Sequence, residues 1–126
     1  MEHNSLVTDF FSTDGYTSSR PSLDDGPGMS HSRPLSGGAA ARNLESFGIW
    51  VAEPGSYESP GASDEIFIVL EGDADLLALN EEYHLRPGSI ATLPAGTKSR
   101  IEVRSTLKKL YLSPRGSQEP AKTPAP

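Results

Sequence analysis

The chain has 126 residues, of which 35% are hydrophobic and 22% charged, with a formal net charge of -6. This length holds at most one domain. The acidic balance argues against nucleic-acid and membrane-surface partners, which select clustered Lys and Arg. The absence of Cys excludes a disulfide framework and thiolate metal sites. No apolar run approaches the ~20 residues that span a bilayer, so we expect a cytoplasmic protein.

Residues 1–42 are predicted to be a mostly disordered N-terminal segment. Ser, Gly, Pro and Asp dominate residues 12–42, and no apolar period there supports a helix or a strand. Residues 114–126 have the same character and are predicted to be a disordered C-terminal tail. The stretch SLVTDFF at 5–11 differs, because its apolar residues suggest an arm that docks elsewhere on the chain.

Residues 43–113 show short strand-like runs separated by turn signals, the pattern of an all-β sandwich or barrel. The expected strands cover 47–53, 65–71, 74–79, 82–85, 89–93, 99–104 and 107–112. Pro-Gly, Gly-Asp, Asn and Pro-Ala-Gly turns lie between them.

The run IFIVL at 66–70 does not alternate, so we expect both of its faces to be covered. A small barrel covers only its inside. A second subunit or the 5–11 arm should therefore cover the outside, and we expect a homodimer.

Glu65 and Gly72 have the spacing that ends one motif of the cupin superfamily, and Gly88, Pro94 and Gly96 have the spacing of its second motif. Over residues 43–113 the chain resembles the small single-domain cupins, a group that includes the ethanolamine-utilisation cupin and the ureidoglycine-aminohydrolase-like cupins. The resemblance implies a cupin barrel of the double-sheet jelly-roll type, flanked by disordered tails.

The metal-binding histidines of those motifs have no counterpart here. By spacing they would fall at Ser59 and Gly61, or at Glu58 and Pro60, and at Ser99. Sites for Mn, Fe, Ni or Zn favour two or three imidazoles beside an oxygen ligand. The sequence therefore predicts no metal ligands and no cofactor.

Strand alternation puts Glu65 on the same face as Phe67 and Val69, and the resemblance implies that this face lines the barrel. A carboxylate on an apolar wall is suited to proton transfer, so Glu65 is the leading catalytic candidate. The full set of candidates comprises catalytic Glu65, Tyr57 (in a loop-like stretch) and Lys109, with ligand-binding Trp50, Phe67, Ser99, Ile101 and Tyr111.

Three interpretations remain open at this point. The first is metal-independent binding of a small organic molecule, with acid–base chemistry of the isomerase, cyclase or lyase kind. The second is a non-catalytic sensor or assembly protein with a degenerate site. The third and weakest is a metal-dependent enzyme with an oxygen-rich site of Glu65, Glu58 or Asp64 and tyrosines.

Overall fold

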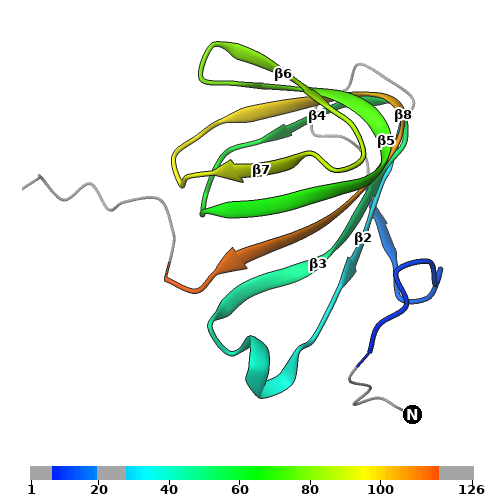
Figure 1. The fold of residues 1–126 in the computed structure, drawn as a ribbon, viewed down its shortest axis with the longest axis vertical. Coiled ribbons are helices and arrows are strands. Elements are labelled where there is room, and N and C mark those ends of the chain that lie inside the picture. Colours follow the sequence, from blue (N-terminus) through cyan, green and yellow to red (C-terminus); the bar gives the residue numbers. More distant parts are fainter. Residues whose placement is uncertain (1–6, 20–27, 117–126) are drawn as a thin grey trace, which may run out of the picture.

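The structure, a computed structural model, describes residues 7–19 and 28–116. Within them the predicted all-β jelly-roll barrel is confirmed (Figure 1). The elements are β1 (Thr17–Ser19), β2 (Ser30–Pro34), the short helix η1 (Gly38–Ala41), β3 (Leu44–Ala52), β4 (Gly55–Ser59), β5 (Glu65–Ala78), β6 (Glu81–Leu85), β7 (Ile90–Leu93) and β8 (Ser99–Pro114). No helix in this described part is long and apolar enough to cross a membrane.

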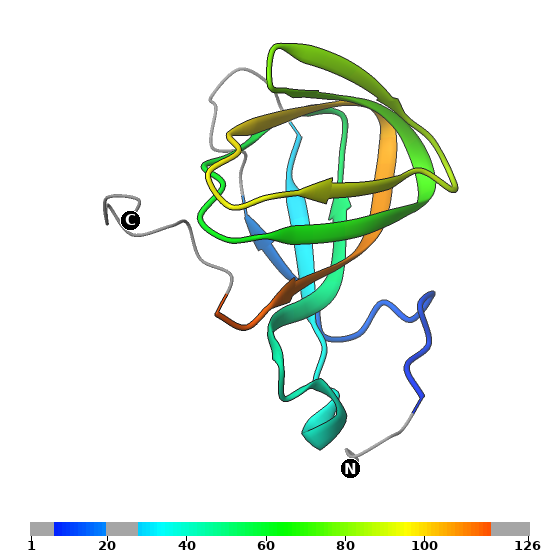
Figure 2. The same ribbon diagram turned by 60° about the vertical axis from the view of Figure 1, so that its left-hand side comes forward.

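Two long strands, β5 and β8, lie next to each other in the sheet and pair along most of their length. The sheet runs in the order β1, β2, β3, β8, β5, β6, with β4 beside β8 and β7 beside β5. The first half of β5 also pairs with β7 and its second half with β6, while β8 pairs first with β4 and then with β3. Each long strand therefore belongs to both halves of the barrel, and Figure 2 shows the strands closing around a common interior.

The prediction of two shorter strands in place of each long one is wrong. The Gly-Asp pair at 72–73 is not a turn, since the pairing of β5 with β8 continues past it with shifts in register between Val69 and Ala74. Gly72 has a φ of +103°, and a Cβ there would lie 2.3 Å from the carbonyl oxygen of Thr106. A bulge at glycine thus bends a continuous strand around the barrel corner.

The turn predicted at Asn80 is confirmed. Leu79 and Asn80 have φ values of 55° and 63°, and the residues that flank them, Ala78 and Glu81, face each other in the β5–β6 pair. Two central residues with positive φ make the type I′ turn that matches the twist of a hairpin.

Two strands lie where the sequence predicts none. β1 and β2 form within residues 12–42, and β2 pairs with β3 from Ser30 opposite Ala52 to Pro34 opposite Gly48. The expectation of no strand there is wrong, because a polar strand can be held by backbone hydrogen bonds to its neighbours and needs no apolar period. β4 is a third unexpected strand, and it takes Tyr57 out of the predicted loop and onto the sheet.

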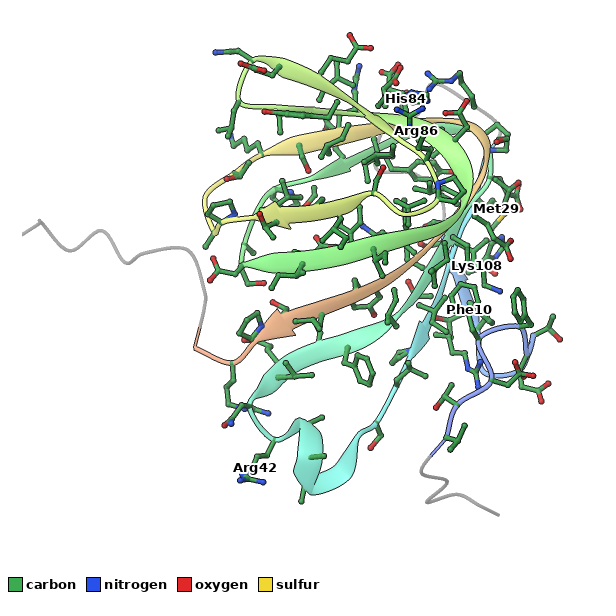
Figure 3. All side chains as sticks on the ribbon, viewed as in Figure 1. Phe10, Met29, Arg42, His84, Arg86 and Lys108 are labelled. Atoms are coloured by element: carbon green, nitrogen blue, oxygen red, sulfur yellow. The ribbon has the colours of Figure 1, made fainter. Side chains whose placement is uncertain are left out.

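The described part of the 5–11 stretch contacts the outside of the barrel. The Lys108 ammonium lies 4.2 Å from the ring centre of Phe10 and 5.3 Å from that of Phe11. Figure 3 shows Phe10 beside Lys108, away from the barrel interior. Residues 5 and 6, like 20–27 and 117–126, lie outside the described residues.

The interior of the barrel holds one cluster of buried apolar side chains. Its members come from both halves of the barrel and are Ala52, Tyr57, Phe67, Val69, Ala74, Leu76, Leu85, Ile101, Val103 and Leu107. The outer face of β5 is less covered, since Ile66 and Leu70 are 38% and 39% exposed. In one copy of the chain, IFIVL is therefore covered fully on its inner face only.

Candidate functional site

A cavity of about 350 Å³ lies in the barrel, lined in part by the connection between β4 and β5. This connection lies on the left in Figure 1. All eight residues that the sequence pattern singled out line it: Trp50, Tyr57, Glu65, Phe67, Ser99, Ile101, Lys109 and Tyr111. They come from β3, β4, β5 and β8. Strand alternation therefore identified the inward faces correctly, although it could not show how the side chains meet.

An ion pair between Lys109 and Glu65 is the central feature of the cavity. The Lys109 Nζ donates a hydrogen bond of 3.0 Å to Oε2 of Glu65. The Lys109 side chain is only 8% exposed and that of Glu65 is 26% exposed. Burial of a charge is costly unless it is paired, and this pairing meets that requirement for both groups.

Two aromatic rings complete the surroundings of the Lys109 ammonium. Its Nζ lies 4.0 Å from the ring centre of Phe67 and 4.7 Å from that of Trp50. Aromatic faces attract cations at these distances, and more strongly where water is excluded. The ammonium is thus held by one carboxylate and two ring faces inside the cavity.

Tyr57 lines the cavity, but its hydroxyl is engaged elsewhere. The hydroxyl lies within hydrogen-bonding distance of the backbone carbonyl oxygens of Glu53 and Met29, at 2.5 Å and 3.1 Å. The ring packs edge-to-face against Trp50 with centroids 5.3 Å apart. Burial, and to a smaller degree Glu53, raises the pKa of Tyr57. The residue is therefore placed as a wall of the cavity rather than as a proton donor to a ligand.

Tyr111 also lines the cavity and has the same strand parity as Lys109 on β8. It faces Phe67 directly in the β5–β8 pair and Gly48 in the β3–β8 pair. A Cβ at Gly48 would lie 2.6 Å from the Tyr111 hydroxyl oxygen, so the missing side chain is what lets the phenol lie across β3. Burial, followed by the charge of Glu65, raises the pKa of Tyr111. Tyr111 is thus a neutral phenol at neutral pH and can donate a proton.

Ser99 and Ile101, both on β8, also line the cavity. They are 8% and 6% exposed, as the alternation of β8 predicts. No described residue near Ser99 forms a nucleophile and base pair with it, and its hydroxyl is suited to hydrogen-bonding a ligand.

The residues at the expected ligand positions do not fit the histidine-bound metal of other cupins. Ser59 and Ser99, at two of the ligand positions, face each other in the β4–β8 pair. Gly61, at a third, has a φ of +76°, and a Cβ there would lie 2.3 Å from the carbonyl oxygen of Thr97. The backbone therefore has no room for a histidine at this position.

An oxygen-rich metal site fits no better. Glu65 is paired with Lys109, and Oδ1 of Asp64 accepts a hydrogen bond from the Ala95 amide at the Pro-Ala-Gly turn. Among the described residues, no three His, Asp or Glu side chains are grouped closely enough to hold a metal ion. The positive charge that the described residues themselves place beside Glu65 is the Lys109 ammonium.

Several serines of the cavity were missed by the sequence pattern. Ser32, Ser46, Ser63 and Ser113 all line it. Ser113 continues the inward parity of residues 109 and 111, and Ser46 that of residue 50, so longer strand predictions would have included both. Ser32 could not have been found, because β2 has no apolar signal.

Comparison with known proteins agrees with this fold. Residues 40–111 match the model of the EutQ-like cupin domain. The chain belongs to the EutQ-like cupin family. No curated protein matches the sequence.

Solved structures resemble this EutQ-like cupin at low identity. EutQ of Salmonella typhimurium LT2 has a TM-score of 0.60 and 18% identity over 68% of either chain. EutQ of Clostridium difficile has a TM-score of 0.60 and 16% identity over 69% of this chain and 63% of its own, so the present chain spans less than two thirds of that protein. Ectoine synthase from P. lautus has a TM-score of 0.58 and 17% identity over 77% and 79%. These likenesses establish the cupin fold.

Proposed function

We propose that this EutQ-like cupin binds a small organic molecule in its barrel and transfers a proton on it without a transition metal. The observation that carries the proposal is the Lys109–Glu65 pair inside the cavity. A cavity of this size with an aromatic lining and a few convergent polar groups is typical of small-molecule sites. The structural relatives include a synthase, which is consistent with chemistry in such a barrel.

The two charged groups suit proton abstraction next to a carbonyl group. Glu65 uses one oxygen for Lys109 and takes a carbon-bound proton from the substrate with the other. The electron pair left on carbon moves to the carbonyl oxygen, where the Lys109 ammonium stabilises the negative charge. Tyr111, a neutral phenol that also lines the cavity, returns a proton to the intermediate, and the proton held by Glu65 then restores the phenol through water. Isomerisation, cyclisation and elimination can all begin with this step.

Proton exchange in D₂O tests the proposal directly. A screen of small carbonyl compounds by thermal shift selects binders, since a ligand specific for the folded state raises the melting temperature. The wild type should then exchange the hydrogen next to the carbonyl group of a binder, observed by proton NMR. Glu65→Gln should abolish exchange and keep binding, while Lys108→Met, which changes a lysine on the outer face, should keep both exchange and binding. Equal exchange in Glu65→Gln would contradict the role of Glu65.

Removal of metal is a separate test. The donor set predicts that EDTA, Mn, Fe, Ni and Zn each leave the melting temperature unchanged. A metal ion that stabilises the wild type but not Glu65→Gln would overturn the metal-free proposal, because it would identify Glu65 as a ligand.

A non-catalytic binding protein is the second candidate. It is favoured by the fact that Glu65 and Lys109 neutralise each other in the structure, which suits recognition as well as it suits catalysis. Binding of carbonyl compounds without any exchange in D₂O would select this candidate.

The outer face of the barrel supports the homodimer. Ile68 faces both Ile90 and Leu110 across neighbouring strands, so the three side chains share one face. Ile90 is 67% exposed, and Ile66 beside them is 38% exposed. We propose that two copies meet through this face. Light scattering should give the mass of two chains, and Ile90→Asp should reduce it to one; a monomeric wild type would refute the proposal.

A further inference from the structure

The position of the Lys109 ammonium has the features of a binding site for an organic cation. A carboxylate oxygen lies 3.0 Å away, and the ring centres of Phe67 and Trp50 lie 4.0 Å and 4.7 Å away. Carboxylates and aromatic faces are what proteins use to hold ammonium groups of ligands. In this structure the cation that fills the site belongs to the protein itself.

The ion pair lies along the cavity rather than across one wall. Lys109 faces Val69, which is four residues beyond Glu65 on the same strand, a separation of about 13 Å along the strand. A lysine and a glutamate meet over that distance only when both side chains extend toward each other. Phe67 lies between them in the strand, which agrees with the ammonium lying over its ring. The pair therefore occupies space that a ligand needs.

A ligand that enters must leave both charges satisfied. The Lys109 side chain is 8% exposed and that of Glu65 is 26% exposed, so an unpaired charge is poorly solvated at Lys109 and only partly solvated at Glu65. An anion that takes Lys109 leaves Glu65 without its partner, and a cation that takes Glu65 leaves Lys109 without its own. A molecule with one positive and one negative group replaces both halves of the pair at once.

We propose that the cavity takes a small zwitterion with an amine and a carboxylate. Its ammonium replaces that of Lys109 beside Glu65 and the two rings, and its carboxylate binds the displaced Lys109 ammonium. This proposal rests on the proposed function, because it names a ligand class for the same small-molecule cavity. The cavity volume of about 350 Å³ suits a molecule of this class.

Matched ligands separate the charges. Glycine, β-alanine and 4-aminobutanoate vary the distance between the two charges, and propanoate, propylamine and propanamide keep the carbon chain with one charge or none. We expect at least one zwitterion to bind the wild type at least about tenfold more tightly than propanoate or propylamine, measured by calorimetry.

Each variant should bind one of the singly charged ligands more tightly and the zwitterion less tightly than the wild type does. Lys109→Met frees Glu65 and the rings, so propylamine should bind this variant more tightly than the wild type while the zwitterion binds less tightly. Glu65→Gln removes the partner of Lys109, so it should raise the affinity for propanoate and lower the affinity for the zwitterion. Lys108→Met, on the outer face, should change none of these affinities.

The outcomes distinguish this proposal from the function on which it rests. Binding of propanamide without binding of any zwitterion would overturn the zwitterion proposal but would still support a small-molecule site. Absence of binding by all six compounds overturns the zwitterion, and the carbonyl screen then decides the proposed function separately. If Lys109→Met does not fold, the wild-type series and Glu65→Gln still decide the result.

Discussion

A double-mutant cycle on Lys109 and Glu65 measures how strongly the cavity depends on its ion pair. Lys109→Met removes one charge-assisted hydrogen bond and leaves the Glu65 carboxylate, which is 26% exposed, without its partner. We expect a loss of about 2 kcal/mol in the free energy of unfolding, below the value for a fully buried pair because water still reaches Glu65.

The second single variant should cost less. Glu65→Gln keeps an oxygen that accepts from Lys109, and the ammonium keeps the faces of Phe67 and Trp50, so we expect a loss of about 1 kcal/mol. The double variant contains neither charge and should also lose about 1 kcal/mol, which gives a coupling energy of about 2 kcal/mol.

Urea unfolding provides the assay. Trp50, the single tryptophan of the chain, lies 4.7 Å from the Lys109 ammonium and reports on the site by fluorescence, with circular dichroism as the global probe. Lys108→Met is the control for loss of a lysine from the same strand. If the two single losses add to within about 0.5 kcal/mol in the double variant, the residues do not interact and the reasoning is refuted.

Three further substitutions test the barrel. Phe67→Ala should cost about 3–5 kcal/mol in urea unfolding, because Phe67 is 1% exposed in the interior; a loss below about 1 kcal/mol would contradict that placement. Gly72→Ala should cost clearly more than Gly88→Ala, because both have positive φ but only Gly72 has backbone atoms in the way of a Cβ; equal losses would contradict the close approach to β8. Arg104 and His84 lower the pKa of Asp73 to about 2, so its stabilising effect is present above about pH 4 and is lost as the pH falls to about 2. Asp73→Asn should flatten thermal stability over that interval, and parallel curves for variant and wild type would argue against these contacts.

The sequence predicted the barrel because its turns carry residues with specific conformational roles. Gly88, Pro94 and Gly96 have the spacing of the second cupin motif. Asn80 supplies a positive φ that few other residues adopt readily. The polar strands β1 and β2 could not be predicted in the same way. β1 and β2 are held by backbone hydrogen bonds, which leave no pattern in the side chains.

Strand parity predicted which residues line the cavity but not how their side chains contact one another. Parity alone placed Glu65, Lys109 and Tyr111 on inward faces, and the cavity contains all three. That Lys109 reaches Glu65 depends on the register of β5 against β8, which period-2 alternation does not fix. The catalytic role predicted for Tyr57 requires a hydroxyl that faces the ligand. In the structure this hydroxyl donates to backbone carbonyl oxygens, one of which belongs to Met29, in a segment where no structure was expected.

The bulge at Gly72 lets β5 continue from one half of the barrel into the other, and β8 does the same opposite it. Neither half can come apart without breaking a strand that the other half shares, so the barrel should unfold as one cooperative unit. A ligand held near Glu65, at the start of β5, would for that reason also slow amide exchange in the β5–β6 hairpin at the opposite end of the same strand. Ligand binding in the cavity would thus slow amide exchange in a part of the backbone that the ligand does not contact.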